Sequence, residues 1–276
     1  MDPLQIYERH HKLIHSIYSS RLKVQILLTL NQGNASLAHL RAVTGSTSQA
    51  LIPKIRTLES QVLVEAANYE YLLTPLGKVV AENVKDYVAL MGGIGRHTGF
   101  WASHDLSGLP QEFLRALGDL HEGEVKSDTT TDMFFVYSHY LEILKDAQYI
   151  HGISSVASPG LASFLAEKVA SGVPVELVVN DEVISLLVQD PYASNMKELS
   201  MFPNFVIWVT EEPLHIGLTV TDRHLSMGLY NKDRKLYDSA SDLFSEDPDA
   251  VAWGERLFQY YKQRSEHLSV SHIFKE

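Results

Sequence analysis

The chain of 276 residues contains no cysteine, and this absence excludes several kinds of site. Disulfides, thiol redox switches, thiolate zinc fingers and cysteine-ligated iron–sulfur clusters all need that side chain. Glycine and proline, at 16 and 10 residues, are too few for a collagen-like or largely disordered chain. We therefore expect a folded protein of a reducing cytoplasm, and we predict no cofactor and no metal site.

Long apolar runs are missing as well. Val24–Leu30 is one of the longest, and it falls well short of the ~18 residues that a membrane-spanning helix needs. The first twenty residues are polar and rich in histidine, without the apolar core of a signal peptide. The sequence thus predicts a soluble cytoplasmic protein with no membrane partner.

Charge is divided unevenly along the chain. Residues 1–80 carry eight Lys and Arg against five Asp and Glu, which gives +3. Residues 81–276 carry 15 basic and 29 acidic residues, which gives −14 and a net charge of −11. A mildly basic head on an acidic body indicates two modules with different tasks.

The head has the pattern of a helix-turn-helix. Apolar residues recur at helical spacing in Arg21–Asn31, Ser36 can cap a second helix that ends near Val43, and a third helix is expected from about Thr47 to Ser60. Gly45 supplies the tight turn between the last two, because glycine tolerates positive φ. Two short helices joined by such a turn form the motif.

A β-hairpin is expected after the third helix, with strands at 61–65 and 69–73 and a turn at 66–68. Thr74 and Pro75 then begin another helix. A helix-turn-helix followed by a hairpin is a winged helix. The strings IRTLESQVLVE and YLLTPLGKVV resemble the recognition helix, wing and exit helix of winged-helix transcription regulators.

In the third helix, Leu51, Ile55 and Leu58 share a buried face and leave polar residues opposite. The recognition helix of this motif lies in the major groove of DNA. We predict that double-stranded DNA is contacted by Ser46, Thr47, Gln49, Lys54 and Arg56, and at the wing tip by Asn68 and Tyr69. Gln49 is suited to read adenine, while Lys54 and Arg56 hold phosphates. Pro53 is expected to bend this helix or delay its start. The alternative is a motif that contacts only protein, with these side chains merely solvated.

Two further helices carry apolar stripes that can pair two copies of the chain. The exit helix places apolar residues at helical spacing until Gly92-Gly93, which we expect to interrupt it: Leu76, Val80, Val84, Tyr87, Val88 and Met91. The opening helix from Pro3 adds Ile6, Leu13 and Ile17. We predict a homodimer that matches a two-fold DNA site, and the alternative is that both stripes pack on their own chain. His11 and His15 have a metal-ligand spacing but no third ligand nearby, so we interpret them as surface residues.

The body alternates strands and helices and predicts an α/β fold. Strands are expected at 147–153, 173–179, 205–209, 215–220 and 225–230, with helices at 160–171 and 181–188. Such units imply a mainly parallel sheet with ligands at the carboxyl ends of its strands. Those ends carry hydroxyl, amide and carboxylate side chains: Ser154, Ser155, Ser158, Asn180, Asp181 and Thr210. Hydroxyls before a helix can bind an anion, although each can equally be a helix cap.

The segment from His215 to Asn231 resembles the phospholipase D motif H-x-K-x4-D followed by G-S-x-N. His215, Asp222, Gly228 and Asn231 match, but Gly217 replaces the phosphate-binding lysine and Leu229 the serine. The enzymes need two such motifs, and this chain has one, so we predict no catalytic residue and no enzyme. The alternatives are a phosphodiesterase with a DNA-targeting head and a protein-interaction module. As ligand-binding residues of a degenerate scaffold we predict Ser154, Ser155, Asn180, Asp181, His215, Asp222 and Asn231.

The whole chain resembles one family, the winged-helix transcription regulators of methanogenic archaea typified by the methanogenesis regulatory protein. The resemblance covers most of residues 20–268 and rests on segments such as GSTSQALIPKIRTLES, FWASHDLSGLPQEFLRALGDL and TDRHLSMGLYNKDRKLYD. It implies a DNA-binding regulator with a sensor domain for a small-molecule effector. We divide the chain into a winged helix-turn-helix at 1–77, a dimerisation helix at 78–99 and an α/β effector domain at 100–276.

Overall fold

The computed structural model describes residues 2–268, which form two compact units divided between Val88 and Ala89. Each unit has its own apolar core, and the units are described separately below. Among the described residues, no helix combines the length and the apolar character needed to cross a membrane.

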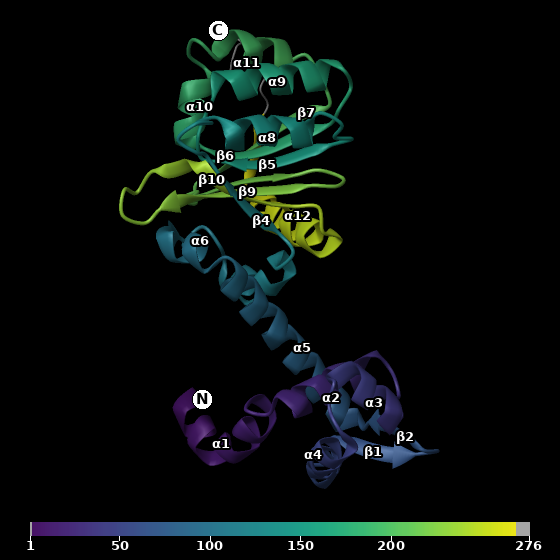
Figure 1. The fold of residues 1–276 in the computed structure, drawn as a ribbon. Helices are drawn as coiled ribbons and strands as arrows, with labels where there is room; N and C mark the ends of the chain where they lie inside the picture. Colours follow the sequence, from purple (N-terminus) through teal and green to yellow (C-terminus); the bar gives the residue numbers. More distant parts are fainter. Residues whose placement is uncertain (1, 269–276) are drawn as a thin grey trace. The chain divides into compact units, whose positions relative to one another are not determined.

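The smaller unit is a bundle of short helices with a two-stranded sheet (Figure 1). Its elements are α1 Pro3–Tyr18, α2 Arg21–Gln32, α3 Leu37–Thr44, α4 Ser48–Ser60, β1 Val64–Ala67, β2 Glu70–Leu73 and the first part of α5 Pro75–Arg96. The Ser36 hydroxyl accepts from the N–H of His39 and begins α3, and Thr47 does the same for Ala50 in α4. Gly45 ends α3 at a φ of 63°. The predicted helix-turn-helix is therefore present.

Helix α4 runs without a break through Pro53, so the expected late start does not occur. It ends in a Schellman motif, in which the N–H of Val62 donates to Glu59 O at 2.9 Å and that of Leu63 to Leu58 O at 3.0 Å. Because Gln61 and Val62 form this helix end, the expected strand at 61–65 is wrong, and β1 begins only at Val64.

The hairpin turn begins two positions later than expected and has two residues instead of three. Ala66 and Ala67 belong to β1, and the two-residue turn is Asn68-Tyr69, with φ values of 51° and 65°. Positive φ at both central residues is the geometry that matches the twist of a hairpin. Asn68 and Tyr69 thus form the tip of the hairpin.

Helix α5 continues through Gly92 and Gly93 to Arg96, so the expected interruption is wrong. A Cβ atom on Gly93 would lie 2.6 Å from Leu117 O. The glycine therefore permits a close approach to the next segment of the larger unit, where the Trp101 indole also donates to Gly93 O at 3.0 Å. Closer to its start, α5 buries Ala81 and Val84 in the core of the smaller unit.

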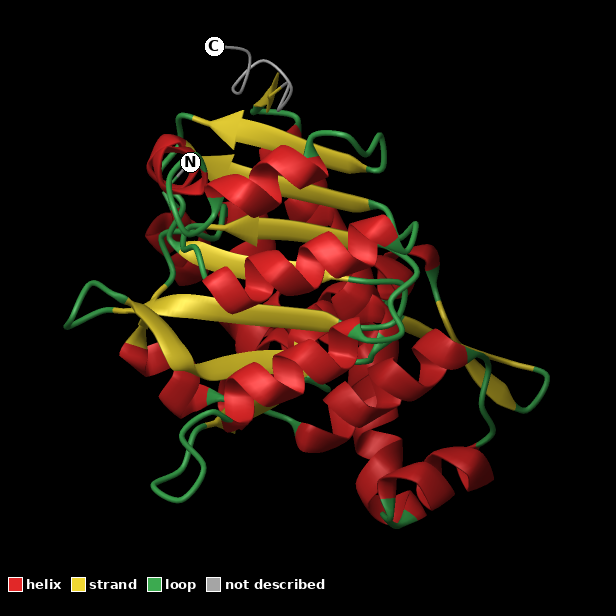
Figure 2. Cartoon of the chain, turned by 90° about the horizontal axis from the view of Figure 1, so that it is seen from above, coloured by secondary structure: helices red, strands yellow, loops and turns green. Residues whose placement is uncertain are grey.

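The larger unit is built on a nine-stranded sheet. Its strands are β3 His104–Asp105, β4 Glu124–Ser127, β5 Ile150–Ser154, β6 Val175–Asn180, β7 Phe205–Thr210, β8 Ile216–Val220, β9 Leu225–Asn231, β10 Tyr237–Ser245 and β11 Glu266–Leu268. Its helices are α6 Thr98–Ser103, α7 Gln111–Arg115, the 3₁₀ helix η1 Leu117–Leu120, α8 Phe135–Leu144, α9 Pro159–Ala170, α10 Asp181–Leu187, α11 Ala193–Leu199 and α12 Pro248–Lys262. Figure 2 shows the strands side by side with helices running along them.

The sheet is mixed, and the expectation of a mainly parallel sheet is wrong. The strand order is β11-β7-β6-β5-β8-β9-β10-β4, with β3 beside β9. Only β5–β6 and β6–β7 pair in parallel among the described strands, and the other pairs are antiparallel. The β-α-β units that suggested the parallel sheet end at β7, after which β8, β9 and β10 follow one another as an antiparallel meander.

Helices cover both faces of this sheet. One face packs against α12, α6, α7 and η1, and its core includes Leu218, Met227 and Trp253. The other face packs against α8, α9, α10 and α11, with Val179 and Phe244 among its buried residues. Because side chains alternate along a strand, β5, β6 and β10 contribute to both cores, whereas the buried apolar residues of β8 and β9 all belong to the first.

Candidate functional site

The polar face of α4 is open to solvent. Gln49 lies in its first turn, and Gln49 and Arg56 are exposed. The Arg56 side chain is 73% exposed and forms an ion pair with Glu59 at 2.9 Å. Lys54 and Ser46 are partly buried, and Thr47 is exposed while its hydroxyl caps the helix. The buried Leu51, Ile55 and Leu58 hold this face outward.

The hairpin adds a second exposed element. Asn68 and Tyr69 form its tip, and Tyr69 is fully exposed. The turn with positive φ holds the Tyr69 ring in solvent, away from the core of the unit. The seven predicted DNA-binding residues thus lie on two parts of the smaller unit, α4 with its preceding turn and the tip of the hairpin.

Lys23 is a cation near this region that the sequence did not single out. It is almost completely buried, and its ammonium group donates to Ser16 Oγ at 2.6 Å. Burial lowers the pKa of Lys23, and the nearby Lys54 lowers it further. Lys54 therefore has a second cation close to it. In the sequence, only the position of Lys23 beside Val24, at the start of α2, suggests that its side chain is buried.

The residues of the phospholipase D-like motif do not converge. His215 precedes β8 and Asp222 follows it, so they lie at opposite ends of that strand. His215 Nδ1 is 2.8 Å from Ser107 Oγ and 3.4 Å from Asp105 Oδ2. Asp222 accepts from the N–H of Gln148 at 2.9 Å, and Asn231 accepts from the N–H groups of Asp233 and Arg234. Each of the three motif residues thus has a local structural contact.

The predicted rim residues come to one edge of the sheet, because β5, β6 and β7 are parallel and in register. Their side chains are mostly engaged there. Asn180 caps α10 through Val183 N, Ser155 donates to Ile216 O, and Ser154 donates to Val156 O. Asp181 is the first residue of α10. Of the seven predicted ligand-binding residues, Ser154 lines the cavity described next, and the others are not part of its lining.

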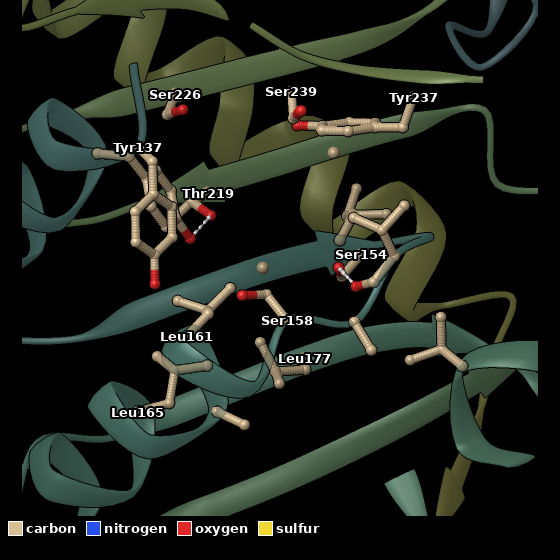
Figure 3. A pocket seen from close by; sticks show the side chains of 18 of the residues that line it. Tyr137, Ser154, Ser158, Leu161, Leu165, Leu177, Thr219, Ser226, Tyr237 and Ser239 are labelled. Carbon is tan, nitrogen blue, oxygen red and sulfur yellow. Dashed lines mark hydrogen bonds between the residues drawn. The ribbon is translucent and has the colours of Figure 1, made fainter. Parts of the chain in front are cut away.

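A cavity of about 660 Å³ lies in the larger unit on the face covered by α8, α9, α10 and α11. Much of its wall is apolar, and Leu161, Leu165 and Leu177 lie together in the lower part of Figure 3. Ser226, Tyr237 and Ser239 lie along the upper part of the same view. This volume falls within the usual range of small-molecule sites.

Small residues on the strands create this space. The cavity-facing positions of β5, β8 and β9 include Gly152, Gly217, Thr219 and Ser226, whereas the opposite face carries Leu218 and Met227. Gly217 pairs directly with Gly228 on β9. The segments IGLTV and LSMGL therefore alternate large and small residues. This alternation in the sequence indicates a cavity on one face of the sheet, whereas our sequence analysis relates the same segments only to the phospholipase D motif.

Tyr237 and Asp242, both on β10, complete the polar end. A Cβ atom on Gly228 would lie 2.0 Å from the Tyr237 hydroxyl and 2.5 Å from Asp242 Oδ1, so both groups use the space that this glycine leaves. Asp242 is 6% exposed and its Oδ2 accepts from Ser226 Oγ at 3.1 Å. Its Oδ1 has no hydrogen-bond partner among the described residues. Burial raises the pKa of Asp242 to about 7.

Comparisons with known proteins agree on one family. The N-terminal domain of "Methanogenesis regulatory protein FilR1" matches residues 11–92, and its middle domain matches residues 133–264. Methanogenesis regulatory protein FilR1 of Methanothrix harundinacea (strain 6Ac) is 27% identical over 260 residues, or 93% of this chain. The chain spans 58% of the length of that relative.

Solved structures of similar fold include the archaeal chromatin protein TrmBL2, at 14% identity and a TM-score of 0.42, which covers 95% of this chain and 99% of its own. Nuc from Salmonella typhimurium, a phospholipase D family member, has 12% identity and a TM-score of 0.41 over 53% of this chain and 97% of its own. Both scores lie below 0.5, so neither likeness supports a functional argument.

Proposed function

The chain belongs to the family of the methanogenesis regulatory protein FilR1, and from this premise we propose that it regulates transcription by binding specific double-stranded DNA. The observation that carries the proposal is the solvent-open polar face of α4, backed by a buried face of Leu51, Ile55 and Leu58. In a helix-turn-helix the corresponding helix enters the major groove with its N-terminal residues at the base edges.

In this arrangement Gln49 is the base-reading residue, because it is exposed in the first turn and glutamine can make two hydrogen bonds to adenine. Arg56, Lys54, Ser46 and Thr47 contact phosphates along the groove. Asn68 and Tyr69 at the hairpin tip contact the flanking backbone.

We further propose that two copies bind together. Helix α1 leaves Leu4, Ile6 and Leu13 exposed, and α5 leaves Leu76, Val79 and Val88 exposed. Exposed apolar residues gathered on two helices of a small unit are typical of an interface. Of the other stripe residues, Ile17, Val80 and Val84 pack in or against the core of their own unit, whereas Tyr87 and Met91 are exposed. In our proposal the exposed residues of both stripes pair the two copies.

The larger unit in our proposal binds a small-molecule effector in its cavity and performs no catalysis. A hollow of this size, largely apolar with a few polar groups, is the usual form of a ligand site. His215 and Asp222 lie at opposite ends of β8, and a side chain on Gly217 would meet the Tyr237 hydroxyl at 2.7 Å. The motif residues therefore do not form one site at which a phosphodiester could react.

DNA binding is tested with the full chain and the DNA upstream of its own gene, by fluorescence anisotropy over a range of salt concentrations. Loss of the Arg56 phosphate contact should weaken binding to all sequences and lower the salt slope by roughly one. Gln49→Ala should cost about 1–3 kcal/mol on the specific site and less on unrelated DNA.

Lys145→Ala is the matched control for Arg56→Ala, because it removes one exposed positive charge in the larger unit. It should leave both affinities unchanged. If Gln49→Ala and Arg56→Ala bind as tightly as the wild type, α4 is not the DNA-contacting helix. If the wild type binds no DNA fragment of its genome even with cell metabolites added, the protein-interaction alternative replaces the regulator.

A further inference from the structure

The cavity of the larger unit has two chemically distinct parts. Leu161, Leu165 and Leu177 form an apolar part, and Tyr237 lies with Ser226 and Ser239 in a polar part (Figure 3). Asp242 belongs to this polar part, because its Oδ2 accepts from Ser226 Oγ. A ligand that fills both parts must itself have an apolar portion and a polar end.

The charges of the lining restrict the sign of that polar end. Asp128 and Asp242 line the cavity, whereas no lysine, arginine or histidine occurs among the described residues of its wall. Asp128 Oδ1 already accepts from the N–H of Val136 at 2.9 Å. A carboxylate or phosphate ligand would therefore meet negative groups and no compensating cation, which is costly in a partly desolvated site.

Asp242 needs a donor that the protein does not provide. Its side chain is 94% buried, because only 6% of the residue is exposed, and Oδ1 has no partner among residues 2–268. An unpaired buried acceptor costs free energy, and a charged donor would satisfy it best. Asp242 belongs to the wall of the cavity.

Aromatic rings complete an environment suited to a cation. Tyr137, Tyr140 and Tyr237 all line the cavity, and the faces of such rings attract positive charge. The Tyr140 hydroxyl is occupied by Thr219 Oγ1 at 2.9 Å, so this tyrosine offers its ring rather than its hydroxyl.

We propose that the cavity binds an amphiphilic organic cation, whose apolar portion lies against Leu161, Leu165 and Leu177 and whose cationic nitrogen pairs with the carboxylate of Asp242. This inference rests on the proposed effector-binding role of the larger unit and names the chemical class of the ligand. When such a cation binds, it pairs with the buried carboxylate of Asp242 and also fills the apolar part of the cavity.

The test compares three probes of equal chain length on the full-length protein at about pH 8, by isothermal titration calorimetry. Octylammonium carries the cation, octan-1-ol a neutral donor and octanoate an anion. Octylammonium should bind about tenfold or more tightly than octan-1-ol, since a charge-assisted hydrogen bond exceeds a neutral one by about 1.4 kcal/mol. Octanoate should bind most weakly.

Asp242→Asn should remove the preference for octylammonium over octan-1-ol while binding of the alcohol is retained. Asp128→Asn is the control, because asparagine keeps the acceptor for Val136 N and neutralises a carboxylate of the same cavity; it should preserve most of the preference. If Asp242→Asn fails to fold, the ranking of the three probes on the wild type decides alone. Equal affinities, a preference for octanoate, or no binding of any probe overturns the inference. DNA binding by the unliganded protein is measured separately, so failure here leaves the regulator proposal intact.

Discussion

At Asp242 the fold holds a carboxylate whose pKa rises from the ordinary 3.8 to about 7, chiefly because burial disfavours the charged form. Ser226 donates to it and lowers the pKa, and Asp238 on the same strand raises it. Tyr140 on α8 and Tyr237 on β10 are the titratable groups close to it, and Lys126 stands opposite on β4.

The pKa shift of Asp242 predicts that stability falls as pH rises. The unfolded chain loses this proton near pH 3.8, but the folded chain keeps it until about pH 7, so the folded state binds more protons between these values. The contribution of Asp242 to the free energy of unfolding is therefore lost as pH rises from about 4 to about 7. The loss is roughly 4 kcal/mol at most and is complete above the folded pKa. Asp242→Asn should be more stable than the wild type at about pH 8, by a few kcal/mol, and nearly equal at about pH 4.

The measurement is urea unfolding of both proteins across this pH range. Asp146→Asn, which removes an exposed carboxylate of the same unit, is the control and should show no comparable gain at high pH. A constant difference between Asp242→Asn and the wild type at all pH values would show that the carboxyl group of Asp242 titrates normally.

At the scale of elements, the junction between α4 and the hairpin contains a strained residue. Val62 ends the Schellman motif with a φ of 59° and is 62% exposed. A residue with a Cβ pays roughly 1–2 kcal/mol in this conformation, and glycine does not. Val62→Gly should therefore stabilise the smaller unit by about 1 kcal/mol, after the greater entropy of glycine in the unfolded chain is allowed for.

Urea unfolding of the full chain, followed by circular dichroism, measures this change. Val43 is a suitable control, since it is a half-exposed valine inside α3, and Val43→Gly should lower stability because glycine is a poor helix former. Loss of stability in both variants would mean that the Val62 backbone carries no strain.

The elements that the sequence predicts well are those whose signal is local. The helices of the smaller unit follow from apolar spacing and from the caps Ser36 and Thr47, and they lie within a few residues of the expected bounds. The hairpin turn was misplaced because Tyr69 takes a positive φ that its residue type gives no reason to expect. Gly93 suggested a helix end, whereas its function is a close approach to Leu117 that only the tertiary structure reveals.

The larger unit shows why strand direction and side-chain burial could not be predicted from local sequence signals. Strands β5 to β9 were expected close to their places, but whether a strand returns parallel or antiparallel depends on tertiary packing, and β10 was not expected at all. Asp242 lies on that strand, so the most distinctive group of the cavity had no local signal. The alternation of small and large residues around Gly217 and Gly228 did carry one.

At the scale of the whole molecule, a net charge of −11 opposes a DNA-binding role unless the chain separates its charges. In our proposal the basic residues of the first eighty positions bind DNA, while the acidic excess resides in the rest of the chain. One copy makes few phosphate contacts, which predicts weak DNA binding. Two copies on a two-fold site double the number of phosphate contacts, although the DNA-binding surface of each copy stays the same. Dimerisation is therefore the step on which tight DNA binding depends in our proposal.

Leu13→Glu tests that step, because Leu13 is 47% exposed on α1 among the apolar residues assigned to the interface. A charge buried at the centre of an apolar interface is expected to separate the copies, so the variant should be monomeric by light scattering at concentrations where the wild type is a dimer. Gln5→Glu adds the same charge to an exposed polar position of α1 and should remain dimeric. The monomeric variant should bind a two-fold DNA site more weakly and with a smaller salt slope, yet bind an isolated half-site like the wild type. A Leu13→Glu variant that stays dimeric would show that the interface lies elsewhere. A wild type that is monomeric at micromolar concentration would show that there is no such interface, and a single copy of α4 would then have to bind the DNA site alone.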